Sequence, residues 1–271
     1  MEVVSNPPTI LVFDSGLGGL TVLRALIDLL PDEPVVYFGD TGRFPYGPKP
    51  DRDVVKYAFE MADLLADHDV KMLVVACNRA SSVALDALRR QYDIPIIGVI
   101  EPGLRAAIQA TETGRVGVIG TVGTIASGAY QRAAAASNAG VELTCAACPG
   151  FAEFVEAGDV DSQEVHVLAE RLLAPVRDAG VDTLVLGCTH YPLLARTIGD
   201  IMGRGVVLVS SADETAFETR SLLGGAGHAR RPGSEPPRRV FVTSGDLATF
   251  RTLGARFLGP EVETVEAWEW S

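Results

Sequence analysis

Two stretches of the sequence share one form: a short apolar run, a small residue, and then a cysteine beside polar residues. Residues 184–194 (LVLGCTHYPLL) carry Cys188 in this arrangement, and residues 73–82 (LVVACNRASS) carry Cys77. A continuous apolar run of about four to eight residues, bounded by turn-forming residues, is typical of a buried strand. Each cysteine is therefore expected in a loop at the carboxyl end of such a strand.

Strand-like runs alternate with helical spacing along the whole chain. This alternation, at the spacing of βαβ units, predicts mostly parallel sheets covered by helices on both faces. Strands are expected at 9–13, 35–38, 72–76, 94–99, 116–119, 206–209 and 240–243, and helices at 20–30, 51–68, 80–92, 101–111, 151–156, 163–177 and 247–257.

The order of these elements indicates that one arrangement occurs twice. After residue 100 a strand, the Gly loop 120–124 and a helix repeat the order that opens the chain. We therefore predict an α/β fold of two similar doubly wound lobes, with the active site in the cleft between them. The first lobe is expected to comprise residues 1–99 plus 211–271, and the second residues 100–210. Residues 224–237 are expected to form a surface linker with little to pack.

Composition excludes several classes of protein. The 271 residues include 47% hydrophobic and 21% charged side chains, which is ordinary for a soluble domain. No apolar run approaches the ~20 residues that span a bilayer, and the N-terminus lacks a signal peptide, so we expect a cytoplasmic protein without membrane contact. A net charge of −12 opposes binding to nucleic acid. The four cysteines are expected to remain thiols.

Two thiols at strand ends suggest a particular chemistry. In open parallel sheets, the loops at the carboxyl ends of strands form the ligand crevice, so facing lobes would place one thiol on each side. Each cysteine also precedes a helix, whose positive end favours the thiolate. Two bases on opposite faces of one carbon are what a stereo-inverting proton transfer requires.

No cofactor or metal is expected. Pyridoxal phosphate needs a Schiff-base lysine, but the chain has only three lysines, and none lies in a loop that suits that role. Cys145 and Cys148 form a C-x-x-C without a second pair, so they are interpreted as packing residues. Residues 16–19 (GLGG) do not complete a dinucleotide-binding fingerprint, because its last glycine would fall at Thr21.

Six motifs, in this order along the chain, resemble the glutamate racemase family of the aspartate/glutamate racemase superfamily. They are 13–22 (FDSGLGGLTV), 45–47 (PYG), 76–78 (ACN), 120–121 (GT), 148–149 (CP) followed by 154–156 (FVE), and 187–192 (GCTHYP). The resemblance runs from about residue 10 to about residue 220. It implies a cytoplasmic bacterial enzyme, commonly a homodimer, that interconverts L- and D-glutamate without a cofactor and supplies D-glutamate for peptidoglycan.

The same resemblance implies roles for particular residues. Cys77 would deprotonate D-glutamate with Asp14 beside it, and Cys188 would deprotonate L-glutamate with Glu156 and His190 beside it. The residues implied to hold the substrate are Asp14, Ser15, Pro45, Tyr46, Gly47, Asn78, Thr121, Thr124, Thr189 and His190, to which we add Arg79.

Arg79 departs from the family pattern, in which a threonine or serine follows Cys-Asn. An arginine here could bind a substrate carboxylate through its fork of N–H groups, fill the pocket, or turn outward. We expect racemisation to survive with a changed affinity.

Other functions remain open at this stage. The superfamily also contains racemases of aspartate and of hydantoins. A two-lobed amino-acid binding protein is a further alternative, as is a weakly active relative that regulates by protein contact, for example by inhibiting DNA gyrase. A binding protein, however, would not need two thiols.

Overall fold

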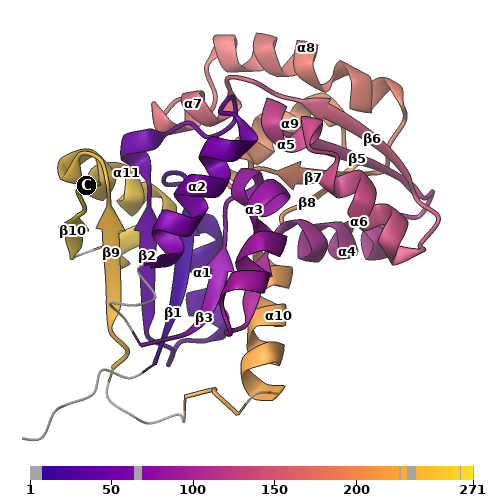
Figure 1. Ribbon diagram of the computed structural model, residues 1–271. Helices are drawn as coiled ribbons and strands as arrows, with labels where there is room; N and C mark the ends of the chain where they lie inside the picture. The colour runs from indigo at the N-terminus through magenta and orange to yellow at the C-terminus, as the bar shows by residue number, and fades with distance from the viewer. Residues whose placement is uncertain (1–7, 64–68, 226, 231–235, 263, 271) are drawn as a thin grey trace, which may run out of the picture.

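Two parallel β-sheets form the centres of two lobes in the computed structural model, which describes residues 8–63, 69–225, 227–230, 236–262 and 264–270 (Figure 1). All pairings between the described strands are parallel, which confirms the predicted fold class. The first sheet has the order β10-β9-β2-β1-β3-β4 and the second β6-β5-β7-β8. The strands of the first sheet are β1 (Thr9–Asp14), β2 (Val35–Gly39), β3 (Val70–Val75), β4 (Ile96–Gly98), β9 (Arg239–Thr243) and β10 (Val265–Ala267). Those of the second sheet are β5 (Arg115–Gly120), β6 (Glu142–Ala147), β7 (Thr183–Gly187) and β8 (Val207–Val209).

The two sheets repeat one topology. Strands β2-β1-β3-β4 and β6-β5-β7-β8 have the same order, so β3, which precedes Cys77, corresponds to β7, which precedes Cys188. In this order the direction of winding reverses between the first and third strands, and a crevice opens there at their carboxyl ends. Both cysteines therefore lie at equivalent positions of two equivalent crevices.

Helices cover both faces of each sheet. The helices around the first sheet are α1 (Leu20–Leu29), α2 (Asp51–Ala62), α3 (Asn78–Gln91), α10 (Ala212–Gly225) and α11 (Leu247–Leu258). The others are α4 (Ile100–Ala110), α5 (Val122–Ala126), α6 (Ala129–Ser137), α7 (Phe151–Glu156), α8 (Gln163–Asp178) and α9 (Ala195–Met202). None of the described helices is long and apolar enough to cross a bilayer.

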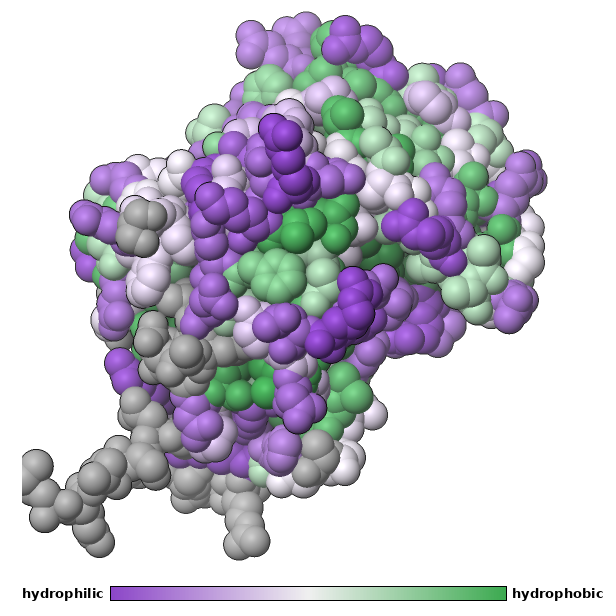
Figure 2. Space-filling model, viewed as in Figure 1, coloured by the Kyte–Doolittle hydropathy of each residue, from purple (hydrophilic) through white to green (hydrophobic). Residues whose placement is uncertain are grey.

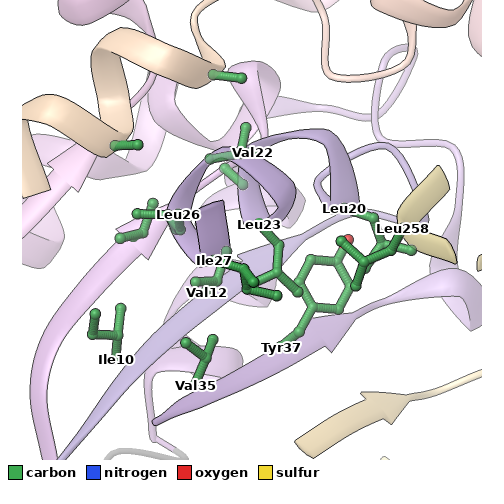
Figure 3. Close-up of a cluster of buried hydrophobic side chains, with 14 of the residues drawn as sticks. Ile10, Val12, Leu20, Val22, Leu23, Leu26, Ile27, Val35, Tyr37 and Leu258 are labelled. Carbon is green, nitrogen blue, oxygen red and sulfur yellow. The ribbon is translucent and has the colours of Figure 1, made fainter. Parts of the chain in front are cut away.

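Strand β1 shows how the core is divided. Ile10 and Val12 pack under α1, α10 and α11, whereas Leu11 and Phe13 pack under α2 and α3. Successive side chains of a strand point to opposite faces, so an uninterrupted apolar strand serves two cores at once. Figure 3 shows the first of these clusters, in which Leu26 of α1 is buried between helix and sheet.

Three elements were not predicted from the sequence. Strand β6 (ELTCAA) is a half-exposed edge strand without a continuous apolar run. Helix α9 follows a proline-containing turn, and α10 exposes Phe217 and Leu222, which weakens its helical pattern. The helix expected over 51–68 ends at Ala62, and residues 64–68 lie outside the described residues.

The expectation of a surface linker at 224–237 agrees with residues 227–230, which have no regular structure and are mostly exposed, but it is wrong for Gly224 and Gly225, which belong to α10. Two backbone contacts hold the described loop. The backbone N–H of Arg230 donates to the buried Glu33 (2.8 Å), and the carbonyl oxygen of His228 accepts from Lys71 (2.8 Å). Residues 226 and 231–235 lie outside the described residues.

The C-terminal segment adds β9 and β10 to the edge of the first sheet. Val240 pairs with Val36 of β2, and β10 continues the sheet beyond β9. Helix α10 packs against α1. We keep the lobe limits, 1–99 plus 211–271 and 100–210, as a proposal.

The burial of Leu26 generates a stability prediction. Leu26→Ala should lower the free energy of unfolding by about 2–5 kcal/mol, because removing buried methyl groups leaves a cavity. The matched control is Leu222→Ala on α10, whose side chain is 40% exposed against 1% for Leu26, so its effect should be less than half as large. Urea unfolding followed by circular dichroism measures both, and equal losses would contradict the packing described here.

Candidate active site

Both cysteines line one cavity between the lobes. Cys77 is the residue that caps the N-terminus of α3, and Cys188 follows the last residue of β7. The cavity has a volume of about 80 Å³. Since a cavity must offer about 10–15 Å³ to hold one water molecule, this one admits a ligand of several non-hydrogen atoms, such as an amino acid. It therefore suits a small substrate.

Glycines in the loop after β1 allow the two lobes to meet. An ideal Cβ on Gly16 would lie 2.5 Å from Glu156 Oε1, and one on Gly18 would lie 2.4 Å from Thr189 Oγ1. Both distances are far below van der Waals contact. The Gly-rich loop predicted from the sequence thus serves close approach by side chains of the second lobe.

Hydrogen bonds across the cleft fix this approach. They run from Leu17 N to Glu156 Oε1 (2.9 Å), from Thr189 Oγ1 to Asp14 Oδ1 (3.2 Å), from Thr21 Oγ1 to the Thr189 carbonyl (3.2 Å), from Gly123 N to the Gly47 carbonyl (3.0 Å) and from Asn78 Nδ2 to Tyr130 Oη (2.9 Å). The cavity is thus enclosed by both lobes.

Cys77 occupies a buried corner of the cavity. Its Sγ donates to Ser15 Oγ (3.5 Å). Burial, followed by the nearby charge of Asp14, raises the pKa of the Cys77 thiol to about 12, while the hydrogen bonds with Ser15 and with the Ala80 N–H oppose the shift. In the ligand-free protein Cys77 is therefore a thiol at neutral pH.

Cys188 lies beside a paired histidine. Its Sγ is 3.6 Å from His190 Nδ1, and His190 Nε2 is 2.8 Å from Glu156 Oε1. Burial alone would lower the pKa of His190, but its contacts with Cys188 and Glu156 raise the pKa well above its usual value. His190 is therefore an imidazolium at neutral pH, and it places a positive charge beside the sulfur of Cys188.

Asp14 is fully buried behind the cavity. Burial raises the pKa of its carboxyl group, and the charge of His190 together with the Gly19 and Gly16 N–H groups opposes that shift. The carboxylate oxygens of Asp14 accept from Gly16 N (3.0 Å) and Thr189 Oγ1 (3.2 Å). The charge of Asp14 raises the pKa of Cys77, although no hydrogen bond joins the two residues among the described contacts. Neither Asp14 nor Glu156 lines the cavity, so both lie behind the groups that do.

Asn78 carries an unused acceptor. Its Nδ2 donates to Tyr130 Oη, whereas its Oδ1 is buried and has no partner among the described residues. Asn78 lines the cavity. A buried carbonyl oxygen without a partner is costly, and a donor on the ligand would satisfy it.

Arg79 does not turn outward, because only 3% of it is exposed. One guanidinium nitrogen donates to the Lys49 carbonyl (3.0 Å) and to the carboxylate of Asp51, while Nε has no partner among the described residues. Asp51 also lines a groove of about 780 Å³ between α2, α3, α4 and α6, and Figure 2 shows the surface hollowed between the lobes. Arg79 thus separates the cavity from this outer groove.

The structure brings the remaining predicted residues to the cavity wall. Tyr46 is buried, and its hydroxyl donates to Asp40. Thr121 and Thr124 share a hydrogen bond between their hydroxyl groups (2.9 Å). The predicted residues that line the cavity are Ser15, Pro45, Tyr46, Gly47, Cys77, Asn78, Arg79, Thr121, Thr124, Cys188, Thr189 and His190.

Sequence reasoning missed nine of the residues that line the cavity, among them Phe44, Cys148 and Glu153. It also missed Tyr130, which accepts a hydrogen bond from Asn78. Burial, with a smaller contribution from Cys188, raises the pKa of Cys148 to about 12. Cys145 instead accepts from Gln131 outside the cavity, so the C-x-x-C pair is divided. The Cys-Pro motif of the family resemblance is a signal for Cys148, whereas the C-x-x-C spacing suggests packing and is misleading for this residue.

Metal ligation finds no support in the described part of the chain. No group of three His, Cys, Asp or Glu side chains gathers there as ligands would.

Comparisons with known proteins identify the family of this chain. Residues 11–218 match the Asp/Glu/Hydantoin racemase family. The chain is 52% identical to a glutamate racemase of Parafrankia sp. over 254 residues (94% of this chain and 92% of the relative), and 52% identical to one of Mycobacterium leprae over 255 residues (94% and 93%).

Solved structures give the same result. A glutamate racemase of Bacillus anthracis superposes with a TM-score of 0.91 at 40% identity, covering 97% of each chain. One of Francisella tularensis, solved in complex with D-glutamate, superposes with a TM-score of 0.89 at 34% identity, covering 97% of this chain and 98% of the other. The family match over most of the chain and the similarity to these relatives show that the chain belongs to the Asp/Glu/Hydantoin racemase family.

Proposed function

We propose that the protein is a cofactor-independent glutamate racemase that interconverts L- and D-glutamate. The observation that carries this proposal is the pair of thiols, Cys77 and Cys188, contributed by opposite lobes to one small cavity. Relatives with this name share half of the sequence over nearly the whole chain, and D-glutamate is bound in the complex from Francisella tularensis.

The reaction follows from the placement of the thiols. With the α-carbon between them, one sulfur in its thiolate form takes the α-proton from one face and becomes a thiol. The electron pair left on the α-carbon then takes the proton of the other thiol from the opposite face, and that sulfur becomes a thiolate. We assign Cys77 as the base for D-glutamate and Cys188 as the base for L-glutamate.

His190, Glu156 and Asp14 support the two thiols. The His190 imidazolium, 3.6 Å from Cys188, stabilises the thiolate that accepts the proton of L-glutamate, and Glu156 holds the ring through its 2.8 Å contact. Asp14 lies behind Cys77 and Thr189. Its charge opposes a lasting thiolate at Cys77, which keeps that residue ready to donate a proton when L-glutamate is the substrate.

The substrate is held by the polar groups of the cavity wall. The free Oδ1 of Asn78 is suited to accept from the α-ammonium group. The hydroxyl groups of Ser15, Thr121, Thr124 and Thr189, together with the Tyr46–Gly47 segment, are suited to the carboxylates. Arg79 supplies positive charge on the same wall.

The cellular role follows from the same assignment. D-glutamate made by this enzyme in the cytoplasm would supply peptidoglycan synthesis. The homodimer is proposed separately, from the resemblance to the family.

Each thiol should be indispensable for inversion. In D₂O the wild-type protein should incorporate deuterium at the α-carbon of either enantiomer during racemisation. Cys77→Ala and Cys188→Ala should each reduce racemisation at least about 100-fold, because an acid–base group contributes on the order of 10²–10⁴. NMR and circular dichroism measure the two processes.

Cys145→Ala is the matched control for these variants. Cys145 is a thiol outside the cavity, so its removal should leave the rate within twofold. Normal racemisation by both active-site variants would refute the two-thiol mechanism.

The raised pKa of Cys77 predicts how its reactivity depends on pH. The thiolate is the form that reacts with iodoacetamide, and its fraction grows tenfold per pH unit below the pKa. Because the pKa lies at about 12, alkylation of Cys77 in the ligand-free protein should accelerate by about tenfold per unit from pH 6 to 9. Mass spectrometry resolves the site, and a plateau below pH 9 would contradict the environment described for Cys77.

Arg79 can be tested by restoring the residue type of the family pattern. Arg79→Thr should raise KM for glutamate about tenfold with kcat little changed, since a hydrogen bond to a charged group is worth about 1.5–3 kcal/mol. Asp51→Asn, which removes the competing carboxylate, should lower KM. A lower KM in Arg79→Thr would instead mean that the arginine fills space that the substrate needs.

A further inference from the structure

The loop between β2 and α2 forms one wall of the cavity and rests on a buried carboxylate. Phe44, Pro45, Tyr46 and Gly47 of this loop line the cavity. Only 1% of Tyr46 is exposed, and its hydroxyl donates to Asp40, which is fully buried. Burial raises the pKa of Tyr46, and the charge of Asp40 raises it further, so the phenol stays a donor. The position of Tyr46 therefore depends on Asp40.

The carboxylate of Asp40 accepts hydrogen bonds from residues near both ends of the chain. Arg43 Nε (2.6 Å) and the Tyr46 hydroxyl donate to its Oδ2. Ser244 Oγ (2.5 Å) and Trp270 Nε1 (3.0 Å) donate to its Oδ1. An ionised carboxylate has about four acceptor sites, so these four donors use its full capacity. If one donor is removed, the Asp40 carboxylate becomes free to move, and the other three donors are held less firmly.

The C-terminal tail forms an aromatic cover over this carboxylate. Trp268 N donates to the Thr243 carbonyl (2.8 Å), which continues the alignment of β10 beside β9. The Trp270 ring packs 5.5 Å from that of Phe38. The Arg43 guanidinium lies between the rings of Trp270 (3.7 Å) and Tyr57 (3.9 Å), a cation–π arrangement on both of its faces.

We propose that Asp40 and Trp270 are positioning residues of the active site. The indole N–H of Trp270 holds the Asp40 carboxylate, which in turn holds Tyr46 and Gly47 against the substrate. The tail thus sets the shape of a cavity wall through Asp40, which lies 230 positions before Trp270 in the sequence. This inference rests on the proposed function, in which Tyr46 and Gly47 contact glutamate.

The chain supplies a matched control for the key hydrogen bond. Trp268 belongs to the same tail and packs on the same Phe38 (6.1 Å between ring centres), but its buried Nε1 has no partner among the described residues. Trp268→Phe and Trp270→Phe each remove one indole N–H and keep an aromatic ring. Trp270→Phe removes the bond to Asp40 and also changes the ring on which the Arg43 guanidinium lies, whereas Trp268→Phe alters neither.

Steady-state kinetics of the full chain test the proposal. Trp270→Phe should raise KM for glutamate about fivefold and change kcat less than twofold, because the substrate-binding wall loosens while the thiols stay in place. Trp268→Phe should change both less than twofold. Each variant keeps one of the two tryptophans, whose fluorescence shows that the tail remains folded. Equal kinetics in the two variants would overturn the proposal.

A second measurement does not depend on the activity. If Asp40 links the tail to the loop, the effects of Trp270→Phe and Tyr46→Phe on the midpoint of urea unfolding should be non-additive, whereas those of Trp268→Phe and Tyr46→Phe should add. Additive effects in both pairs would overturn the link. If the variants show non-additive effects but the wild-type protein does not racemise glutamate, the proposed function is refuted and the link between the tail and the loop remains.

Discussion

The close approach of the two lobes at Gly16 and Gly18 is the constraint on which the cavity depends. A side chain at either position would collide with Glu156 or Thr189 of the second lobe. Because the first position lacks a side chain, Glu156 Oε1 can accept from Leu17 N while it also contacts His190. The carboxylate that holds the histidine is therefore itself held by the opposite lobe. The electrostatic environment of Cys188 is complete only when the lobes are together.

The two halves of the site are built from equivalent strands but have different chemistry. Cys77 follows β3 in a buried corner near Asp14, where both burial and charge favour the neutral thiol. Cys188 follows β7 beside the imidazolium of His190. The repeated topology thus sets where each sulfur lies, whereas residues that differ between the two lobes, such as Asp14 and His190, set its electrostatic surroundings. In the ligand-free protein Cys77 is therefore ready to donate a proton.

The sequence predicts the positions of the two thiols better than it predicts the contacts around them. The positions of Cys77 and Cys188 follow from a local pattern, an apolar run that ends at a small residue, together with a general rule for parallel sheets. Strand β6, the counterpart of β2, escaped prediction because an exposed edge strand needs no apolar run. The contacts of Asn78 with Tyr130 and of Arg79 with Asp51 join distant segments, so no local spacing announces them. Likewise, nothing near Asp40 in the sequence indicates Trp270.

The unlike thiols raise the question of whether the enzyme could favour one enantiomer. L- and D-glutamate have equal free energies in water, so under the proposed mechanism kcat/KM must be the same in both directions at every pH. The unlike surroundings of Cys77 and Cys188 therefore cannot bias the product. They act instead on the protonation forms of the free enzyme, and so on the fraction of the enzyme that can react with each substrate. The other form must be regenerated by proton exchange through His190 or solvent. The asymmetry can then appear in kcat and KM separately, while their ratio stays fixed.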